Sequence, residues 1–325
     1  MATSSRVGVS ELFIPERYAC CILWATPIRV SSTDCPDHLY SEYLYTSIRA
    51  RINALEHDRM NRSQSANGDS GLLAQSRVLV GIDDTDNPAS PGTGWLAQSL
   101  LKELVSQRLG EALGATRHQL LQDPRVPYTS HNSSACLALA TSDAPDLDAI
   151  EQCAAQFLRD NAAEGSDPGL AIVATDLAQA DREALSEFGF AVKREIIDQA
   201  TARALAPEHG VRLSGHGGTE DGVIGALAAI GLHLHGSDGF FLWTPGIRDM
   251  HAGWCSYQHL ITTLPVDDAR TLDGHRPTPD TIVEVGPWIR PLLLGGHVVL
   301  LLERIELTDA PPKWRTAPRD VVRRH

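Results

Sequence analysis

The sequence predicts a mixed α/β fold. From residue 77 onward, short apolar stretches alternate with amphipathic stretches of helical period, the pattern of α/β units. Hydrophobic residues make up 42% of the 325 positions, enough for a sizeable core in one large or two ordinary domains. No apolar run reaches the ~18 residues of a membrane span, and no secretory signal is visible, so we expect a cytoplasmic protein.

The first 76 residues differ from the rest of the chain. The polar run Asn61–Ser70 has the composition of a linker. We therefore expect residues 1–76 to be a peripheral or disordered extension.

The first half of the remaining chain contains three short apolar strands and two amphipathic helices. Leu96, Leu100 and Leu104 line one face of the first helix, and Gly110 ends it. The expected strands are Arg77–Ile82, Ala135–Ala140 and Gly169–Ala174, and the expected helices are Trp95–Leu109 and Leu147–Leu158.

The second half begins near Lys193 and shows weaker patterns. We expect a helix at Arg194–Ala206 stopped by Pro207, an extended Val211–Leu213, a glycine-rich turn and helix at 216–231, strands at Phe240–Trp243 and Val298–Ile305, and a loose tail at 311–325. In the HLH segment, His233 and His235 would share one strand face, either as a metal pair or as a solvated edge.

The segment VLVGIDDTDNPASPGTGWL, residues 78–96, carries the clearest chemistry. Asp83, Asp84 and Asp86 follow a buried strand, and open α/β sheets bind ligands at the carboxyl ends of their strands. Carboxylate oxygens are preferred Mg²⁺ ligands, so these three residues are candidates for a metal site, with Asp83 and Asp84 catalytic. A solvated Asp-rich turn is the alternative interpretation.

The second part of this segment resembles a phosphate-binding helix start. Gly92, Thr93 and Gly94 precede Trp95, and helix N-termini attract phosphate through free N–H groups. Thr93 either caps the helix or presents its hydroxyl to a phosphoryl group. No G-x-x-x-x-G-K-[ST] sequence occurs, so this is not a Walker A loop.

Five segments occur in an order that matches a known family. They are GIDDTD with GTGWL, RVPYTSHN at 125–132, DPGLAIV at 167–173, GVIGALAAIG at 222–231, and SDGF at 237–240. Together they resemble the archaeal tRNA 2-agmatinylcytidine synthetase, which acts on an isoleucine tRNA.

The resemblance implies a fold and a reaction. It implies a kinase-like domain at 77–190, followed by a ferredoxin-like domain and C-terminal strands at 191–310. It also implies ATP and Mg²⁺ as cofactors, phosphorylation of an acceptor oxygen, and displacement of the phosphate by an amine. Thr93 would be the counterpart of the family threonine that takes part in phosphate transfer.

The chain also departs from the family pattern. Gly92 and Gly94 replace the Cys and the second Thr of its C-T-T segment, the Arg of its T-R-G-N segment is absent, and no zinc-ribbon cysteines are present. The net charge of −13 opposes broad binding to a phosphate backbone. We therefore expect this chain to contain the catalytic part of the family's enzymes without their OB-fold and zinc ribbon. We expect it to act on a small-molecule or nucleoside-type acceptor and on an amine.

Two other functions remain open at this stage. The protein could modify tRNA with the help of a separate RNA-binding partner, or it could be a nucleotide-binding regulator without turnover. The oligomeric state is not predicted.

Several further residues are candidates for the same site. Thr85, Gly217, Gly218 and Arg125 are expected to bind nucleotide or phosphate together with Gly92 and Gly94, and Asn132, His131 and His216 are expected to bind substrate. Lys193 and Arg194 could stabilise phosphoryl charge, and Asp176 could join the site from the end of another strand.

Overall fold

The computed structural model describes residues 71–126, 131–141, 144–307 and 311–324. All of them belong to one compact unit, Gly68–His325. The prediction for the N-terminal extension lies outside the described residues, except for its last six positions, where a short helix, α3 (Leu72–Gln75), precedes the first strand.

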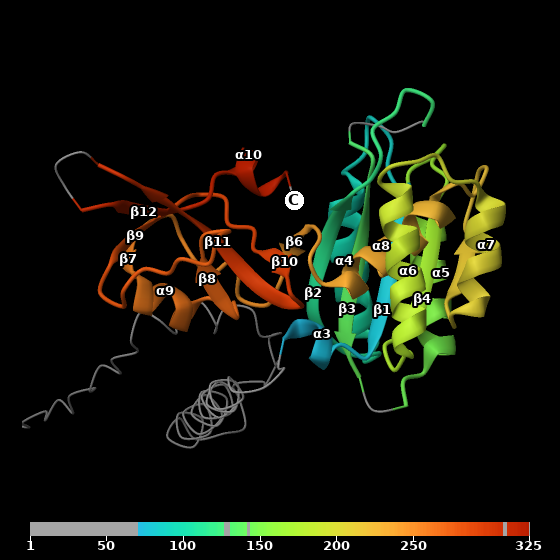
Figure 1. Ribbon diagram of the computed structural model, residues 1–325. Coiled ribbons are helices and arrows are strands. Elements are labelled where there is room, and N and C mark those ends of the chain that lie inside the picture. The colour runs from blue at the N-terminus through green and yellow to red at the C-terminus, as the bar shows by residue number, and fades with distance from the viewer. Residues whose placement is uncertain (1–70, 127–130, 142–143, 308–310, 325) are drawn as a thin grey trace, which may run out of the picture. The chain divides into compact units, whose positions relative to one another are not determined.

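The described chain forms a mixed α/β structure, as the sequence predicts (Figure 1). Its first part contains β1 (Val78–Asp83), α4 (Thr93–Ser106), β2 (Glu111–Gln119), β3 (Ser133–Ala140), α5 (Leu147–Asn161), β4 (Gly169–Ala174), α6 (Gln179–Val192), α7 (Gln199–Glu208), β5 (Arg212–Gly215) and α8 (Gly222–His235). Its second part contains β6 (Phe240–Trp243), β7 (Gly253–Ser256), α9 (Tyr257–Thr263), β8 (Asp268–Arg270), β9 (Ile282–Val285), β10 (Leu292–Leu294), β11 (His297–Ile305), β12 (Lys313–Thr316) and α10 (Arg319–Val322).

One 12-stranded sheet connects both parts, in the order β5-β4-β1-β3-β2-β6-β10-β11-β12-β9-β7, with β8 beside β11. Strand β1 lies between β3 and β4 and is antiparallel to both. The carboxyl end of β1 therefore lies beside the start of β3 and the start of β4. This arrangement determines which loops meet at the site.

Helices cover both faces of the first part of the sheet. Val78, Val80 and Ile82 of β1 share a core with α4 and α5, whereas Leu79 shares another with α6 and α8. Alternate residues of a strand point to opposite faces, so β1 is buried on both sides and reads as a continuous apolar run.

Helix α8 lies unusually close to β1 and β4. A Cβ atom on Gly81 would lie 2.1 Å from the Ala226 carbonyl oxygen, and one on Gly169 would lie 2.0 Å from the Gly222 carbonyl carbon. Only glycine allows this approach, because no real Cβ contact is so short. The contact brings the N-terminus of α8 beside the carboxyl end of β1.

The second part of the chain extends the same sheet and builds a separate core. Strand β6 pairs with β2, and β10 pairs with β6. Tyr257 and Leu260 of α9 pack with residues of β9, β11 and β12, including Val283 and Trp314.

The structure differs from the expected division at residue 190. Strands β4 and β5 pair across that position, and α8 packs on β1, β3 and β4. Residues 191–235 therefore contribute a strand and helices to the same sheet and helix layers as residues 77–190.

Three local predictions need correction. His233 and His235 lie in α8 rather than in a strand, because the apolar period of GVIGALAAIG continues through them. Helix α7 begins only at Gln199, where Asp198 accepts the Thr201 N–H as an N-cap, and Pro207 lies inside it.

The expected loose tail also differs from the structure. In the segment after residue 310, β12 pairs with β9 and β11, and the Trp314 and Val322 side chains are buried. Burial of these apolar groups explains the order of a segment whose Pro and Arg content predicts a loop. Strand β2 was also not predicted, and its register with β3 is interrupted between Ala112 and Gly114.

Every helix in the described ranges is too short or too polar to span a lipid bilayer.

We predict that Gly81→Ala lowers the free energy of unfolding by about 3 kcal/mol, because the new methyl group would force α8 away from β1. Urea unfolding would measure this loss. Gly286→Ala is the matched control, since its Cβ would lie 3.3 Å from a side-chain hydroxyl rather than from backbone. Equal stability of the two variants would contradict the close helix–strand contact.

Candidate active site

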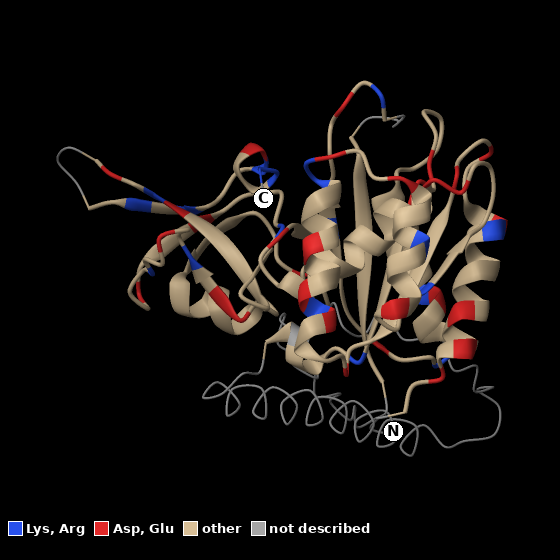
Figure 2. Ribbon diagram, turned by 45° about the vertical axis from the view of Figure 1, so that its right-hand side comes forward, with Lys and Arg blue, Asp and Glu red and all other residues tan. Residues whose placement is uncertain are grey.

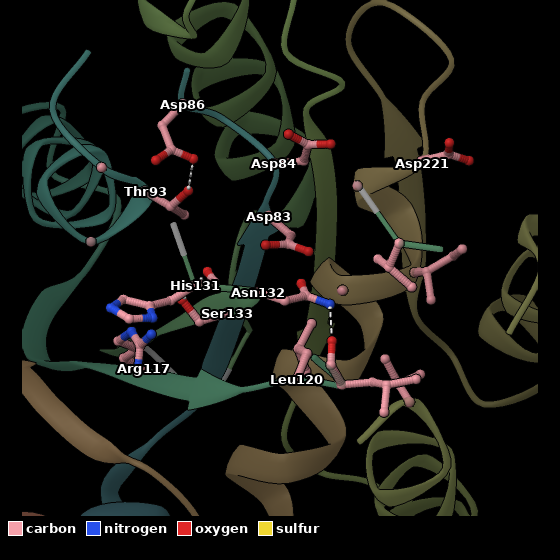
Figure 3. Close-up of a pocket in the computed structure, with 18 of the residues that line it drawn as sticks. Asp83, Asp84, Asp86, Thr93, Arg117, Leu120, His131, Asn132, Ser133 and Asp221 are labelled. Carbon is pink, nitrogen blue, oxygen red and sulfur yellow. Dashed lines mark hydrogen bonds between the residues drawn. The ribbon is translucent and has the colours of Figure 1, made fainter. Parts of the chain in front are cut away.

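A pocket of about 870 Å³ opens at the carboxyl end of β1. Because β3 is antiparallel to β1 and β2 is antiparallel to β3, the start of β3 and the end of β2 lie at the same edge. The N-termini of α4 and α8 complete the wall (Figure 3). The sequence-predicted edge is therefore the edge at which the structure has its large pocket.

The predicted carboxylates line this pocket together. Asp83 ends β1, and Asp84 and Asp86 follow in the loop toward α4. Asp84 has a φ of 50°, in the left-handed region that residues other than glycine rarely adopt. Strained backbone of this kind concentrates at functional sites, and here it turns the chain sharply at the end of the strand.

Burial and mutual repulsion make these carboxylates easy to protonate. Burial raises the pKa of Asp83 to about 8, with further contributions from the charges of Asp84 and Asp86. Burial likewise raises the pKa of Asp84 to about 6, reinforced by the charge of Asp167 and, more weakly, by those of Asp86 and Asp221. The acidic end of the pocket thus lacks enough positive charge to stabilise its carboxylates.

Gly225 of α8 makes room for the Asp83 side chain. A Cβ atom on this glycine would lie 1.7 Å from Asp83 Oδ2. The close approach of α8 therefore buries the carboxylate and fixes its position at the floor of the pocket.

Thr93 is the first residue of α4, and its side chain is buried. Its hydroxyl donates to Asp86 Oδ1 at 3.2 Å and accepts from the Thr85 hydroxyl at 3.1 Å, as Figure 3 shows for Asp86. Gly92, in the N-cap position, makes no side-chain cap. The Thr93 proton is therefore directed toward a carboxylate, and Thr93 does not cap its own helix.

The acidic end of the pocket fits a cation that is also coordinated by water or phosphate oxygens. Among the residues that the structure describes, no three His, Cys, Asp or Glu side chains converge as a ready-made metal site. The predicted three-carboxylate site is thus not preformed. Asp83 and Asp84 do fit the arrangement typical of Mg²⁺, in which one or two carboxylates act with water and phosphate oxygens.

Arginines line a second part of the pocket, and none of them is among the charges that shift the pKa of Asp83 or Asp84. Four of them come from β2, the loop before β10, and α10 with the residue that follows it: Arg117, Arg290, Arg319 and Arg323. His131 lies beside Arg117 (Figure 3), and burial together with the charges of Arg117, Arg323 and Arg319 lowers its pKa. In Figure 2, acidic segments gather in loops of the α/β part and basic segments lie near the C-terminus.

The substrate-binding predictions are placed as follows. Asn132 and His131 both line the pocket. The Asn132 side chain donates to the Leu121 carbonyl at 2.7 Å, which fixes the loop after β2. Residues 127–130 of the RVPYTSHN segment lie outside the described residues.

Other predicted phosphate ligands do not face the pocket. Gly217 and Gly218 let the chain turn around the Asp167 carboxylate, which accepts the Thr219 N–H at 2.6 Å. They therefore surround an acidic side chain rather than a phosphate. His216 also lies outside the pocket lining, with its ring 2.9 Å from the Ser214 hydroxyl.

Arg125 and Thr85 contribute differently from the prediction. Arg125 borders the pocket, but it is exposed and forms an ion pair with Asp123 at 2.8 Å. Thr85 does not line the pocket, and its buried hydroxyl instead orients Thr93. Gly94 lines the pocket, where a Cβ would lie 3.0 Å from Leu242.

The remaining charged candidates lie elsewhere. Lys193 forms an ion pair with Asp238, which also accepts from His118. Asp176 follows the end of β4, and because β4 is antiparallel to β1, this end lies at the opposite edge of the sheet. Arg194 is exposed and does not line the pocket.

Sequence reasoning missed the arginine cluster, as well as Asp167 and Asp221 near Asp84. Asp221 directly precedes α8, within the glycine-rich turn. An acidic residue at a helix start is a pattern from which its position could have been predicted. No local pattern marks the arginines, since they come from positions far apart in the sequence.

Comparison with known proteins gives partial similarities. No protein-family model matches the chain. "Uncharacterized protein MJ0921" of Methanocaldococcus jannaschii is 28% identical over 163 residues, which cover 50% of this chain and 51% of that protein. This chain thus matches about half the length of that curated relative.

About half of the chain is also similar to solved structures of TiaS, the isoleucine-tRNA agmatidine synthetase that the sequence motifs resemble. Apo TiaS is 23% identical with a TM-score of 0.40, covering 48% of this chain and 35% of that chain. The complex of TiaS with its isoleucine tRNA and ATP is 24% identical with a TM-score of 0.41, covering 48% and 36%.

We predict that Asp83→Asn raises the stability of the ligand-free protein at pH 8.5 by about 1 to 3 kcal/mol, because it removes a buried charge that lacks compensation. The pKa of Asp83 is raised on folding, so its contribution to stability is full below pH 4 and is lost as the pH rises through about 8. The gain from asparagine should therefore shrink toward pH 5.

Urea unfolding at both pH values would test this dependence. Asp280→Asn, at an exposed position, is the control and should change stability little at either pH. A gain that is the same at pH 5 and pH 8.5 would contradict the burial of an ionised Asp83.

Proposed function

We propose that this protein is an enzyme that uses ATP and Mg²⁺ to phosphorylate an oxygen atom of its acceptor, in the manner of the tRNA 2-agmatinylcytidine synthetases. The observation that carries the proposal is the Thr93 hydroxyl at the start of α4, hydrogen-bonded to Asp86 in the pocket that Asp83 and Asp84 also line. Carboxylates, a helix N-terminus and a hydroxyl are the elements that phosphoryl transfer needs in one pocket.

The residues would divide the chemistry among them. Asp83 and Asp84 would hold Mg²⁺, which neutralises charge on the phosphates and on the two carboxylates. The backbone N–H groups at Gly92, Thr93 and Gly94 would face the phosphates, because helix N-termini leave these donors free.

Thr93 would act at the transferring phosphoryl group. Its hydroxyl is oriented by Thr85 and points its proton at Asp86, so Asp86 can take that proton if the Thr93 oxygen attacks the γ-phosphorus. The bond from the γ-phosphorus to ADP would break as the new P–O bond forms, and the phosphoryl group would then pass to the acceptor oxygen. An amine would displace it as inorganic phosphate, which leaves a C–N bond.

We expect Thr93→Ala and Asp84→Asn each to lower Mg²⁺-dependent ATP turnover by about 100-fold or more, because each removes a group that contacts the transferring phosphate or its metal. Phosphate release with candidate acceptors measures this loss. Thr262→Ala, at an exposed threonine of α9, should keep full turnover. Turnover that survives both site substitutions would exclude the mechanism.

A second experiment separates turnover from simple binding. We expect label from γ-labelled ATP to appear on the wild-type protein in the presence of Mg²⁺, and not on Thr93→Ala. Thermal stabilisation by Mg²⁺–ATP without labelling or phosphate release would instead favour a nucleotide-binding regulator.

A further inference from the structure

The arginine end of the pocket is the second charged feature of the site, and the mechanism above does not use it. We propose that Arg117, Arg290, Arg319 and Arg323 bind a phosphate ester of the acceptor substrate, and thereby hold the acceptor oxygen toward Thr93. This inference rests on the proposed function for the identity of the ligand as the acceptor.

The four arginines differ from most others in their ion pairing. Ion pairs in the described residues occupy many other arginines, for example Arg276 with Asp268 and Arg315 with Glu303. No such pair within the described ranges involves any arginine of the cluster. In a protein of net charge −13, four cations without such partners in one pocket indicate an anionic ligand.

The cations also repel one another. Burial, and then the charge of Arg323, lowers the pKa of Arg117 to about 10. Burial lowers the pKa of Arg290 as well, with contributions from Arg248 and Arg319. An anion that enters this end would remove the repulsion and replace water as the hydrogen-bond acceptor.

One donor of the cluster is buried without an acceptor in the described part of the chain. Arg323 Nε is shielded from solvent and has no hydrogen-bond partner among those residues. A buried donor of this kind is costly unless a ligand or water accepts from it. It supports the anion site independently of the charges.

Aromatic rings hold the guanidinium groups in place. Arg290 and Arg319 lie 5.5 and 5.9 Å from the centre of the Trp288 ring, and Arg117 lies 5.6 Å from that of Phe240. A guanidinium group over a ring keeps its N–H edge free for oxygen ligands. Several such edges suit the oxygen atoms of a phosphate better than the two of a carboxylate.

The pocket extends beyond the acidic cluster. Its volume of about 870 Å³ lies near the upper end of the range for single ligands, and its acidic and basic ends belong to the same cavity. In the proposal, a phosphate ester occupies the basic end, and Mg²⁺ and ATP occupy the acidic end. The ester could be a free phosphorylated molecule, such as a mononucleotide, or one link of a nucleic acid strand.

The test is equilibrium binding of three probes in the absence of ATP: a nucleoside, the corresponding nucleoside 5′-monophosphate, and a short single-stranded RNA of that base. We expect the wild-type protein to bind the monophosphate but not the nucleoside, and inorganic phosphate to compete. Arg290→Gln and Arg323→Gln should each weaken monophosphate binding about tenfold or more. Arg315→Gln is the matched control and should bind as the wild type does.

The same variants should leave Mg²⁺–ATP binding unchanged, whereas Asp84→Asn should weaken Mg²⁺–ATP binding and leave monophosphate binding unchanged. Their melting temperatures should not fall, because each arginine substitution relieves repulsion. Tighter binding of the RNA than of the monophosphate assigns the ester to a nucleic acid, and the reverse order assigns it to a small molecule.

Two results would overturn the inference. One is a failure of the phosphate to matter: the wild type binds nucleoside and monophosphate equally, or the arginine variants bind the monophosphate as tightly as the wild type does. The other is a parallel loss of Mg²⁺–ATP binding in the arginine variants, which would assign the basic end to ATP itself. Failure of the proposed function would give a different result. In that case Thr93→Ala would keep full ATP turnover, while the wild-type protein would still bind the phosphate ester.

Discussion

The contact between α8 and β1 is the constraint on which the site depends. Gly81, Gly169 and Gly225 let the helix lie against the backbone of two strands, and a Cβ atom at any of them would overlap its neighbours. This contact places the start of α8 beside the carboxyl end of β1 and buries Asp83 against the helix. The raised pKa of Asp83 follows from that burial, so the packing of the core determines the electrostatics of the pocket.

The pocket separates charge in a way that a ligand would compensate. Carboxylates without sufficient positive charge lie at one end, and arginines without acidic partners among the described residues lie at the other. Each cluster destabilises the ligand-free protein, and each would be stabilised by a ligand of opposite charge. Strained backbone at Asp84 and the buried Arg323 Nε fit the same interpretation, because proteins concentrate such costs at functional sites.

The sequence predicts the elements whose pattern is local. Strands β1 and β4 are buried on both faces, so they appear as uninterrupted apolar runs, and α4 shows its leucines at helical spacing. The position of the acidic cluster at a strand end, ahead of a helix, could also be predicted, since it needs only the order of the elements along the chain.

What the sequence does not predict depends on pairing over long distances. Asp176 was a candidate for the site because strand direction was unknown, and the antiparallel pairing of β4 with β1 places it at the opposite edge. The GHGG segment has the composition of a phosphate-binding turn, yet it surrounds Asp167, which is more than 45 residues away in the sequence. The arginine cluster combines residues of β2 and α10 that are about 200 positions apart in the sequence. The hydrophobic periodicity of a sequence predicts local structure and cannot predict such a contact.

The most direct test of the account is the number of protons released when Mg²⁺ and a non-hydrolysable ATP analogue bind. Calorimetry at pH 6.5 in two buffers of different ionisation enthalpy measures this number. The account requires Asp83 and Asp84 to lose protons as the metal arrives, so it predicts net proton release that Asp83→Asn reduces. Binding with no proton release, or with a release that Asp83→Asn leaves unchanged, would show that the metal and nucleotide do not occupy the buried acidic end of the pocket.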